Sequence, residues 1–352
     1  MSRRKADERS GCGGGAGAFS GDGSVRYGGQ AVIEGVMMRG PTRVATAVRA
    51  PGGSIVVDEK EYLPVSRRYR LLRLPVIRGG ITLIESLVLG VKALNYSAAA
   101  AMEEPSTGAD SEGGPSARSA VESGDEPAGA EAGSEDRPGL KANVMLTGTV
   151  VFAFALGIAF FFYIPLVLTD WLTRSMGSES GVLFNLIDGV IRVIFFLIYL
   201  WAISQWKEMR RVFEYHGAEH KTIFTLEAGE ELRPENARKH TTRHPRCGTS
   251  FLLIVMVVSI LIFMIFGRPQ NVTHRLLRLL LIPVIAGASY EVLKLSAKWA
   301  HRPWARWLVA PGVWLQRITT KEPSDDQIEV AIAALNAVRI DTDHVREAPG
   351  DS

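Results

Sequence analysis

The residues best suited to do chemistry in this chain of 352 residues lie close together in its second half. Four of its seven histidines fall between positions 216 and 244, and a cysteine follows soon after: His216, His220, His240, His244 and Cys247. Neutral imidazoles and thiolates are the ligands that zinc takes most often in proteins. The grouping therefore predicts a divalent-metal site, with zinc as the expected ion.

Residues 216–220 read His-Gly-Ala-Glu-His, a spacing that favours a helical metal-binding motif. On a helix, His216 and His220 are four residues apart and share one face, so both imidazoles can reach one ion. Glu219 then stands beside the ion without being a ligand, as in the inverted zincins. A metal lowers the pKa of a bound water to about 7, so the expected chemistry is hydrolysis, with Glu219 as general base.

The remaining ligands decide whether such a site is catalytic or structural. Two histidines with one further ligand, either His244 or Cys247, leave an open position and predict a catalytic site. If His216, His220, His244 and Cys247 all bind, the tetrahedron is closed and the site is structural. A third interpretation needs no metal, because histidines in a basic loop beside a membrane can form local hydrogen bonds or bind lipid phosphate.

Two further residues are candidates for a supporting role at the ion. Glu291 lies in an apolar stretch, where a carboxylate is costly. It is therefore expected to be a ligand or a partner of the ligands, or else to form a salt bridge with Lys294. His240 is the weaker candidate, because its neighbours Lys239 and Thr241 are typical of exposed chain.

Four apolar stretches accompany the histidine cluster and predict a membrane protein. They cover residues 144–168, 182–204, 250–266 and 276–295. A membrane-spanning helix needs about 20 mostly apolar residues, a length that each stretch approaches or exceeds. The fourth stretch is the weakest, because it contains Arg278, Glu291 and Lys294.

The charges between these stretches predict their orientation. The loop 205–249 contains nine Lys or Arg residues, whereas the loop 170–181 contains one. Since basic loops stay in the cytoplasm, the histidine cluster and both chain termini are predicted to be cytoplasmic. Four spans, rather than three, are needed to bring the basic C-terminal segment to the same side.

Charge also divides the chain into regions. The formal net charge is +3, but residues 103–138 hold ten acids and two bases, so the rest of the chain carries +11. This acidic stretch has few apolar residues and is predicted to be a disordered linker. Residues 1–25 and 341–352 are predicted to be tails, the first of them disordered. The composition excludes fibrous, collagen-like and disulfide-framework proteins.

The whole chain is predicted to be an α-helical polytopic membrane protein with a small α+β cytoplasmic domain. That domain covers residues 26–102, with a β-hairpin around Pro51-Gly52-Gly53. Residues 81–94 should form a helix too short to span, and hence re-entrant or interfacial. The glycine-rich segment 28–40 is predicted to be a strand with tight turns, with a ligand-contacting loop as the alternative. Residues 139–298 should form the four-helix transmembrane region.

Residues 299–340 are predicted to begin on the cytoplasmic membrane surface and to end in a docked helix. Basic residues recur every four positions across the start of this region, interleaved with tryptophans: Lys294, Lys298, Arg302 and Arg306. This pattern is typical of contact with the bilayer and its anionic head groups, and no nucleic-acid partner is expected. Ser324 and Gln327 form a capping box, and the helix that follows should pack on the hairpin domain.

Several stretches resemble the bacterial YqhQ family of uncharacterised membrane proteins. The similarity is carried by residues 28–40, 83–87, 93–97, 215–222, 244–250 and 311–316, and it extends over nearly all of residues 26–340. The family is a domain of unknown function, sometimes described as predicted metal-dependent enzymes. The resemblance implies location in the bacterial inner membrane. It also implies metal at His216, Glu219, His220, His244 and Cys247, and it names no substrate.

Two functions of different classes remain open from the sequence. The first is a metal-dependent hydrolase that acts on a membrane-associated or lipid-linked molecule at the cytoplasmic membrane surface. The second is a non-catalytic membrane scaffold or regulator, with a structural zinc site or without metal. A transporter is a distant third, because four spans are few and such a function would require a homo-oligomer.

Overall fold

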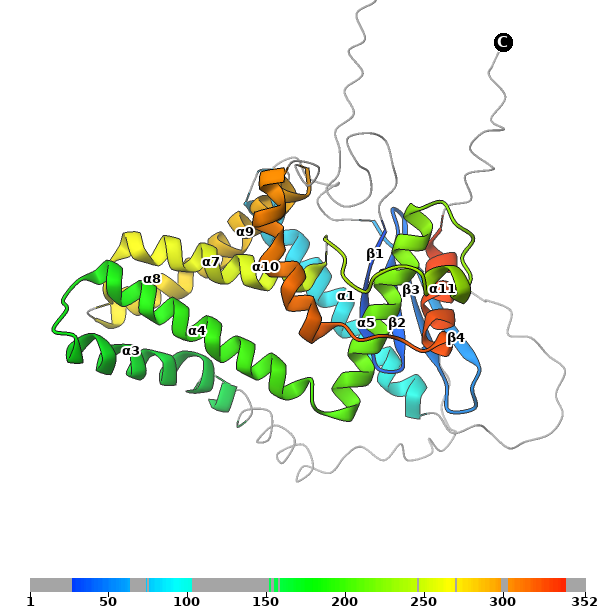
Figure 1. Ribbon diagram of the computed structural model, residues 1–352, viewed down its shortest axis with the longest axis horizontal. Coiled ribbons are helices and arrows are strands. Elements are labelled where there is room, and N and C mark those ends of the chain that lie inside the picture. Colours follow the sequence, from blue (N-terminus) through cyan, green and yellow to red (C-terminus); the bar gives the residue numbers. More distant parts are fainter. Residues whose placement is uncertain are drawn as a thin grey trace, which may run out of the picture.

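In the computed structural model, an apolar helical bundle forms one end of an elongated molecule and a small sheet with its helices forms the other (Figure 1). The structure describes residues 27–63, 74, 76–102, 152, 155–157, 159–245, 247–269, 271–298 and 303–339. The predicted linker 103–138 and both predicted tails lie outside these residues. The predicted fold class is confirmed: the described chain is mostly helical, with a small antiparallel sheet.

In the described part of the chain, four helical segments are long and apolar enough to cross a membrane. They are Ala155–Ser175, Gly181–Ile203, Gly248–Phe266 and Leu276–Ser296. The last three agree with the predicted spans. The first continues beyond its predicted end at 168, because Pro165 lies in the first turn of α3 (Ile164–Ser175), where its missing N–H breaks no hydrogen bond.

The bundle helices pack through glycines and enclosed polar contacts. α4 (Gly181–Ile203) approaches α7 (Gly248–Phe266) closely, since a Cβ atom at Gly189 would lie 2.1 Å from Ile260 Cγ1. Arg192 pairs with Asp188 one turn before it and donates to the carbonyl of Phe161 in the π-helix η3 (Ala159–Tyr163). The fourth candidate span is built from α8 (Val272–Leu280) and α9 (Ile282–Lys298).

Four strands follow one another in an antiparallel meander. They are β1 (Gly28–Val32), β2 (Gly35–Arg39), β3 (Arg43–Arg49) and β4 (Ile55–Glu61), in the spatial order β1-β2-β3-β4. The predicted hairpin is confirmed as β3–β4, and Gly53 in its turn adopts a φ of +85°. The segment 28–40 forms the β1–β2 hairpin, which agrees with its interpretation as strand with tight turns.

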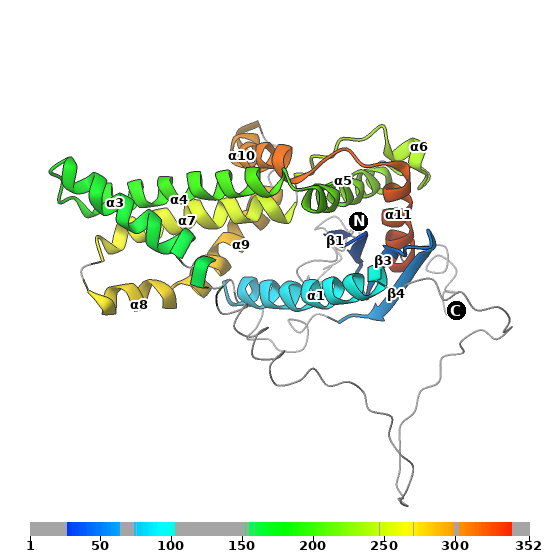
Figure 2. The same ribbon diagram turned by 90° about the horizontal axis from the view of Figure 1, so that it is seen from below.

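The sheet is the middle of three layers (Figure 2). Successive strand residues point to opposite faces, so Val36 and Met38 of β2 face a core shared with α5 (Lys207–Glu227) and α11 (Asp325–Val338). Met37 faces the other way, toward Ala93 of α1 (Ile77–Met102). The predicted capping box at the start of α11 is confirmed, as is the packing of that helix on the sheet.

Two helices connect the bundle end to the sheet end. α1 contains 26 residues, more than the 14 predicted at 81–94, because it extends to pack on both α9 and the sheet. α10 (Pro303–Thr319) begins at a proline, which is well suited to the first turn of a helix. α10 lies across the long axis of the molecule, beside the start of α7 (Figures 1 and 2). The short α6 (Pro234–Ala237) lies in the loop after α5.

Candidate metal centre

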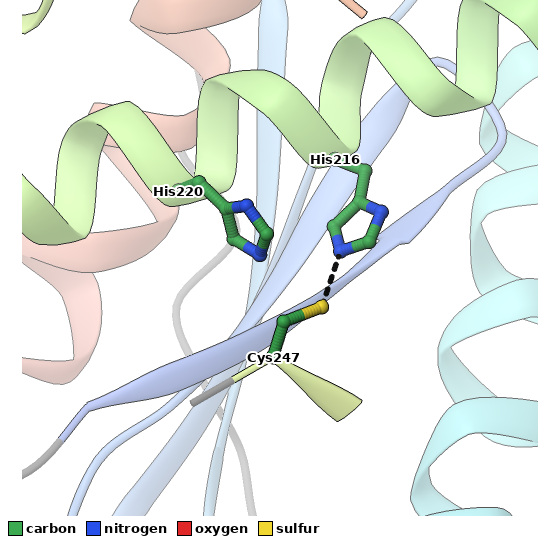
Figure 3. Close-up of side chains that lie close together, drawn as sticks. All are labelled: His216, His220 and Cys247. Atoms are coloured by element: carbon green, nitrogen blue, oxygen red, sulfur yellow. Dashed lines mark hydrogen bonds between the residues drawn. The ribbon is translucent and has the colours of Figure 1, made fainter. Parts of the chain in front are cut away.

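Two helices bring the candidate ligands together at the junction of the bundle and the sheet (Figure 3). His216 and His220 lie one turn apart in the middle of α5, and Cys247 is the N-cap residue of α7. The metal-binding atoms of these three residues all lie within 4.8 Å of one another. His216 and His220 therefore lie on one face of α5, as their spacing in the sequence predicts.

Backbone carbonyls hold both imidazoles in one orientation. His216 Nδ1 donates to the carbonyl of Thr319 at 2.8 Å, and His220 Nδ1 donates to that of Thr242 at 2.5 Å. In a neutral ring with its proton on Nδ1, the lone pair lies on Nε2, and His216 Nε2 is 3.2 Å from Cys247 Sγ. Donation from the other ring nitrogen to a carbonyl is how proteins orient metal-binding histidines.

Burial keeps one of these imidazoles neutral. The pKa of His220 is lowered, because desolvation disfavours its charged form more than the neighbouring Cys247 favours it. A neutral imidazole is the form that binds metal. The protonation state at neutral pH is therefore the one that a metal site requires.

Cys247 presents its sulfur from the first turn of a helix. Its Sγ accepts from the backbone N–H of Thr249 at 3.4 Å and lies 3.1 Å from the hydroxyl of that residue. A negatively charged sulfur at this point faces the positive end of the α7 dipole. Tetrahedral zinc places nitrogen and sulfur ligands about 3.3–3.8 Å apart, so the observed spacing needs only small side-chain shifts to enclose an ion.

Glu219 is buried beside the three candidate ligands. Its Oε2 lies 3.6 Å from His220 Nε2 and 4.0 Å from His216 Nε2. Burial raises the pKa of Glu219, although the nearby His216 and His244 and a hydrogen bond from the backbone N–H of Gly29 oppose this shift. A carboxyl group with a raised pKa accepts a proton more readily near neutral pH.

Gly29 brings the glycine-rich segment into contact with the site. A Cβ atom at this position in β1 would lie 2.7 Å from the carbonyl oxygen of Met37 and 2.8 Å from Glu219 Cγ. The strand can approach the carboxylate only because residue 29 has no side chain. The segment 28–40 is therefore a strand hairpin, and it also contacts Glu219; its alternative role as a ligand-contacting loop stays a prediction.

The structure places His244 next to the cluster but outside the three-ligand group. Its Nε2 lies 3.5 Å from Glu227 Oε2, and its ring packs on Phe224 with centroids 4.5 Å apart. Desolvation lowers the pKa of His244. Of the two residues considered as third ligand, Cys247 is the one whose ligand atom joins His216 and His220.

The two supporting candidates have other partners. His240 Nε2 lies 3.2 Å from Glu230 Oε2 in the loop after α5. Glu291 accepts two hydrogen bonds from Arg78 of α1, each at 2.7 Å, in a contact between α1 and α9. The salt bridge considered for Glu291 was with Lys294, whereas the structure pairs Glu291 with Arg78, which is distant in sequence.

Gln316 of α10 is a site-supporting residue that the sequence did not reveal. Its Oε1 accepts from the backbone N–H of His244 at 2.7 Å, and its Nε2 donates to the carbonyl of His244 at 2.8 Å. Nε2 also lies 3.2 Å from Ser250 Oγ. This fully buried amide thereby holds the segment that carries Cys247. Gln316 ends the stretch 311–316 that carries part of the family resemblance, but that stretch does not signal such a role.

The chain after α10 crosses directly over the histidine helix. Lys321 donates its backbone N–H to the carbonyl of Phe213, and a Cβ atom at Gly217 would lie 2.0 Å from the carbonyl oxygen of Lys321. The glycine of the His-Gly-Ala-Glu-His motif is therefore explained by this close crossing. The buried Lys221 forms an ion pair with Glu322 at 2.6 Å, which fastens the same segment.

Comparisons with known proteins identify relatives but no activity. A family model described as "Protein of unknown function (DUF1385)" matches residues 74–340. The chain is 32% identical over 315 residues to the "Uncharacterized protein YqhQ" of Bacillus subtilis (strain 168), a match that covers 88% of this chain and 91% of that protein. No solved structure matches the chain.

Proposed function

Because the chain belongs to the DUF1385 family of proteins of unknown function, we propose its activity from the site alone: metal-dependent hydrolysis at the cytoplasmic surface of the inner membrane. The proposed ion is zinc, held by His216, His220 and Cys247. Glu219 is the proposed general base. The proposed substrate is a membrane-associated or lipid-linked molecule, since the cluster lies at the end of an apolar bundle.

One observation carries this proposal. The Nδ1 atoms of both histidines are held by backbone carbonyls, so that His216 Nε2 faces the sulfur of Cys247 and a buried carboxylate lies alongside. Three protein ligands with one position left for water or substrate are the usual composition of catalytic zinc sites, whereas structural sites use four. His244, the fourth ligand of the structural alternative, has Glu227 as its neighbour instead.

In the proposed reaction, each residue of the site would have a separate role. Zinc at this site would act as a Lewis acid and make a water molecule easier to deprotonate. Glu219 would accept that proton at its Oε2 atom and return it to the leaving group. The N–H of Gly29 would keep the carboxylate in place, and the carbonyls of Thr319 and Thr242 would keep both imidazoles aimed at the ion.

A structural zinc site in a membrane scaffold is the second candidate, and burial favours it. Cys247, His220 and Glu219 are each buried, and the cluster joins α5 to the first turn of α7. An ion here would fasten the sheet end of the molecule to the bundle. His244, whose ring centroid lies 5.7 Å from that of His220, would be the fourth ligand in that case.

Metal content and function of variants distinguish these candidates. Full-length protein, purified without chelators, is expected to contain one zinc per chain and to lose it when His216 and His220 are both replaced by alanine. His240→Ala is the matched control and should keep the metal, because its ring pairs with Glu230. A wild type without metal would contradict both candidates.

Glu219→Gln then separates catalysis from structure. It keeps the shape of the side chain but removes the proton acceptor, so the hydrolase proposal expects zinc and melting temperature to be retained and complementation of a deletion strain to be lost. If the site is structural, Glu219→Gln should keep complementation, whereas Cys247→Ser should release zinc and lower the melting temperature.

A further inference from the structure

The side chains of α1 are distributed in the reverse of the order expected for a helix in water. Its buried positions hold small residues, namely Gly79, Gly90, Ala93, Ser97 and Ala100. Six of its large aliphatic residues are exposed, namely Ile77, Ile84, Leu87, Val88, Val91 and Leu94. Ile81, Leu83 and Leu89 are partly buried, and Leu89 packs against the sheet. In a water-soluble domain the aliphatic stripe of a helix faces the core. The pattern of α1 is instead that of a helix with an apolar environment on its outer side.

The exposed aliphatic residues of α1 form one continuous stripe. Their spacing of three, four and seven residues places them on the same side of the helix. The stripe is about 26 Å long at 1.5 Å per residue. Ile84 and Leu87 near its centre are 64% and 68% exposed. A long aliphatic patch of this kind marks a surface for lipid or protein.

The first turns of α1 lie against a candidate membrane span. A Cβ atom at Gly79 would lie 2.9 Å from the carbonyl oxygen of Gly287 in α9, and Arg78 pairs with Glu291 of the same helix. Close contacts between small residues are typical of helices that pack inside membranes. Gly287 precedes Ser296, the end of that span, by nine residues, which places this contact about 13 Å inside the span.

The helix α9, on which α1 packs, also exposes large aliphatic residues. These residues include Val284, Val292 and Leu295. The other half of α1 leaves the bundle and contacts the sheet, where the hydroxyl of Ser97 accepts from the backbone N–H of Ile33 and Gly90 approaches the side chain of Gln30. The helix therefore extends from the interior of a candidate span to the sheet.

We propose that α1 is a fifth membrane-embedded helix, whose N-terminal turns enter the sheet-side leaflet without crossing it and whose aliphatic stripe contacts phospholipid acyl chains. The partner is lipid rather than protein, because α1 packs on a candidate span that also exposes aliphatic residues and because the fully buried positions of α1 hold small residues. The proposal does not depend on a metal. It implies that the sheet is held at the membrane surface from two sides, by α1 and by the α4–α5 connection.

Spin labels on single cysteines test this proposal in full-length protein reconstituted into phosphatidylcholine–phosphatidylglycerol vesicles. Cysteines replace Ile84, Leu87 and Val91, and Val57 of β4 provides an exposed aliphatic control at the far end of the sheet. The parent chain carries Cys12→Ser and retains the buried Cys247, which sets the background. Collision rates are measured with oxygen, which concentrates in lipid, and with a water-soluble nickel chelate.

Labels on the stripe are expected to collide with oxygen at least threefold more often than with the nickel chelate, and the label at Val57 should show the opposite preference. Nickel accessibility on the stripe equal to that at Val57 would place α1 in water and overturn the proposal. Low accessibility to both reagents would mean that a protein surface covers the stripe, which also overturns it.

A polar substitution provides a second readout that needs no label. Leu87→Gln should raise the fraction of protein extracted from the vesicles by alkaline carbonate at least twofold, because an amide is disfavoured among acyl chains. Val57→Gln, its matched control, should leave extraction unchanged. Equal extraction of both variants would contradict lipid contact at α1.

Discussion

At the scale of single residues, the candidate site depends on backbone atoms that orient its functional side chains as well as on those side chains. The imidazoles of His216 and His220 are aimed by carbonyls of Thr319 and Thr242, and Glu219 is held by the N–H of Gly29. These partners contribute backbone atoms, so side-chain substitution at their positions acts through packing. At Gly29 that packing is tight, since a Cβ atom there would lie 2.7 Å from the carbonyl oxygen of Met37.

Gly29→Ala is expected to disturb Glu219 while leaving the fold in place. The new methyl group would overlap the carbonyl of Met37 and Cγ of Glu219, and overpacking of this kind costs about 1–3 kcal/mol. Unfolding of the purified protein in detergent should show this loss, and complementation should fail. Gly28→Ala is the matched control, because a Cβ atom there meets nothing within 4 Å. Equal effects of the two substitutions would contradict this account.

Gln316→Leu is expected to loosen the segment that carries Cys247. It leaves the buried N–H and carbonyl of His244 without their amide partner, at a cost of about 2 kcal/mol. Residues that orient ligands change metal affinity by about 10–100-fold when removed, so zinc should dissociate more readily in a competition titration with a chromogenic chelator. Gln205→Leu, at an exposed position, should leave zinc affinity unchanged; a matching loss there would point to a nonspecific effect.

At the scale of elements, the two ligand-bearing helices have different tasks. α5 places two histidines one turn apart and buries them against the sheet and the crossing chain at Lys321. α7 starts at the third candidate ligand and continues directly into a candidate span. The relative position of bundle and sheet therefore determines whether the three ligand atoms meet, and α1 is one of the connections that sets it.

Arg78→Gln tests the contact that fastens α1 to α9. The guanidinium donates to both oxygens of Glu291, and both side chains are largely buried. Removal of one partner leaves a poorly solvated charge, so the expected loss of stability is about 2 kcal/mol or more. Adding Glu291→Gln should restore part of it, as measured by thermal unfolding in detergent.

The exposed pair Arg43–Glu59 of the sheet provides the control for this measurement. Arg43→Gln should change stability by less than about 1 kcal/mol, because exposed ion pairs contribute little. If Arg78→Gln proved no more destabilising than Arg43→Gln, the connection between α1 and α9 would have to rest on packing alone.

At the scale of the whole molecule, the proposed orientation follows from charge. Nine basic residues in the loop 205–249 against one in the loop 170–181 predict that the candidate metal centre faces the cytoplasm. The described structure agrees with a single-sided arrangement, because the sheet, α5 and α11 all lie at one end of the bundle (Figure 1). The same side would then present the site to a reducing compartment, where Cys247 stays a free thiol or metal ligand.

Reporter fusions test this orientation. Alkaline phosphatase, which is active only outside the cytoplasm, should be active when fused after Arg174 and inactive when fused after Glu231. A fluorescent protein that folds only in the cytoplasm should give the reverse result at the same two positions. Phosphatase activity after Glu231 would reverse the topology and place Cys247 in an oxidising compartment.

Local features of this protein were determined by the sequence itself. The four candidate spans follow from the length of apolar runs, the β3–β4 hairpin from alternation around a Pro-Gly-Gly turn, and the start of α11 from a capping box. The pairing of His216 with His220 follows from the helical repeat. Each of these features depends on residues that are close together in the sequence, so a local sequence pattern is enough to predict it.

Only the tertiary structure decided which distant residues meet. It chose Cys247 rather than His244 as the third candidate ligand, placed Gly29 on Glu219, and gave Glu291 the partner Arg78 from more than 200 positions away. It also determined which side of α1 is buried and extended that helix beyond its predicted ends at 81 and 94. These contacts depend on how the sheet, α1, α5 and α10 pack around one junction. The elements come from opposite ends of the chain, and no local sequence pattern encodes the distances between them.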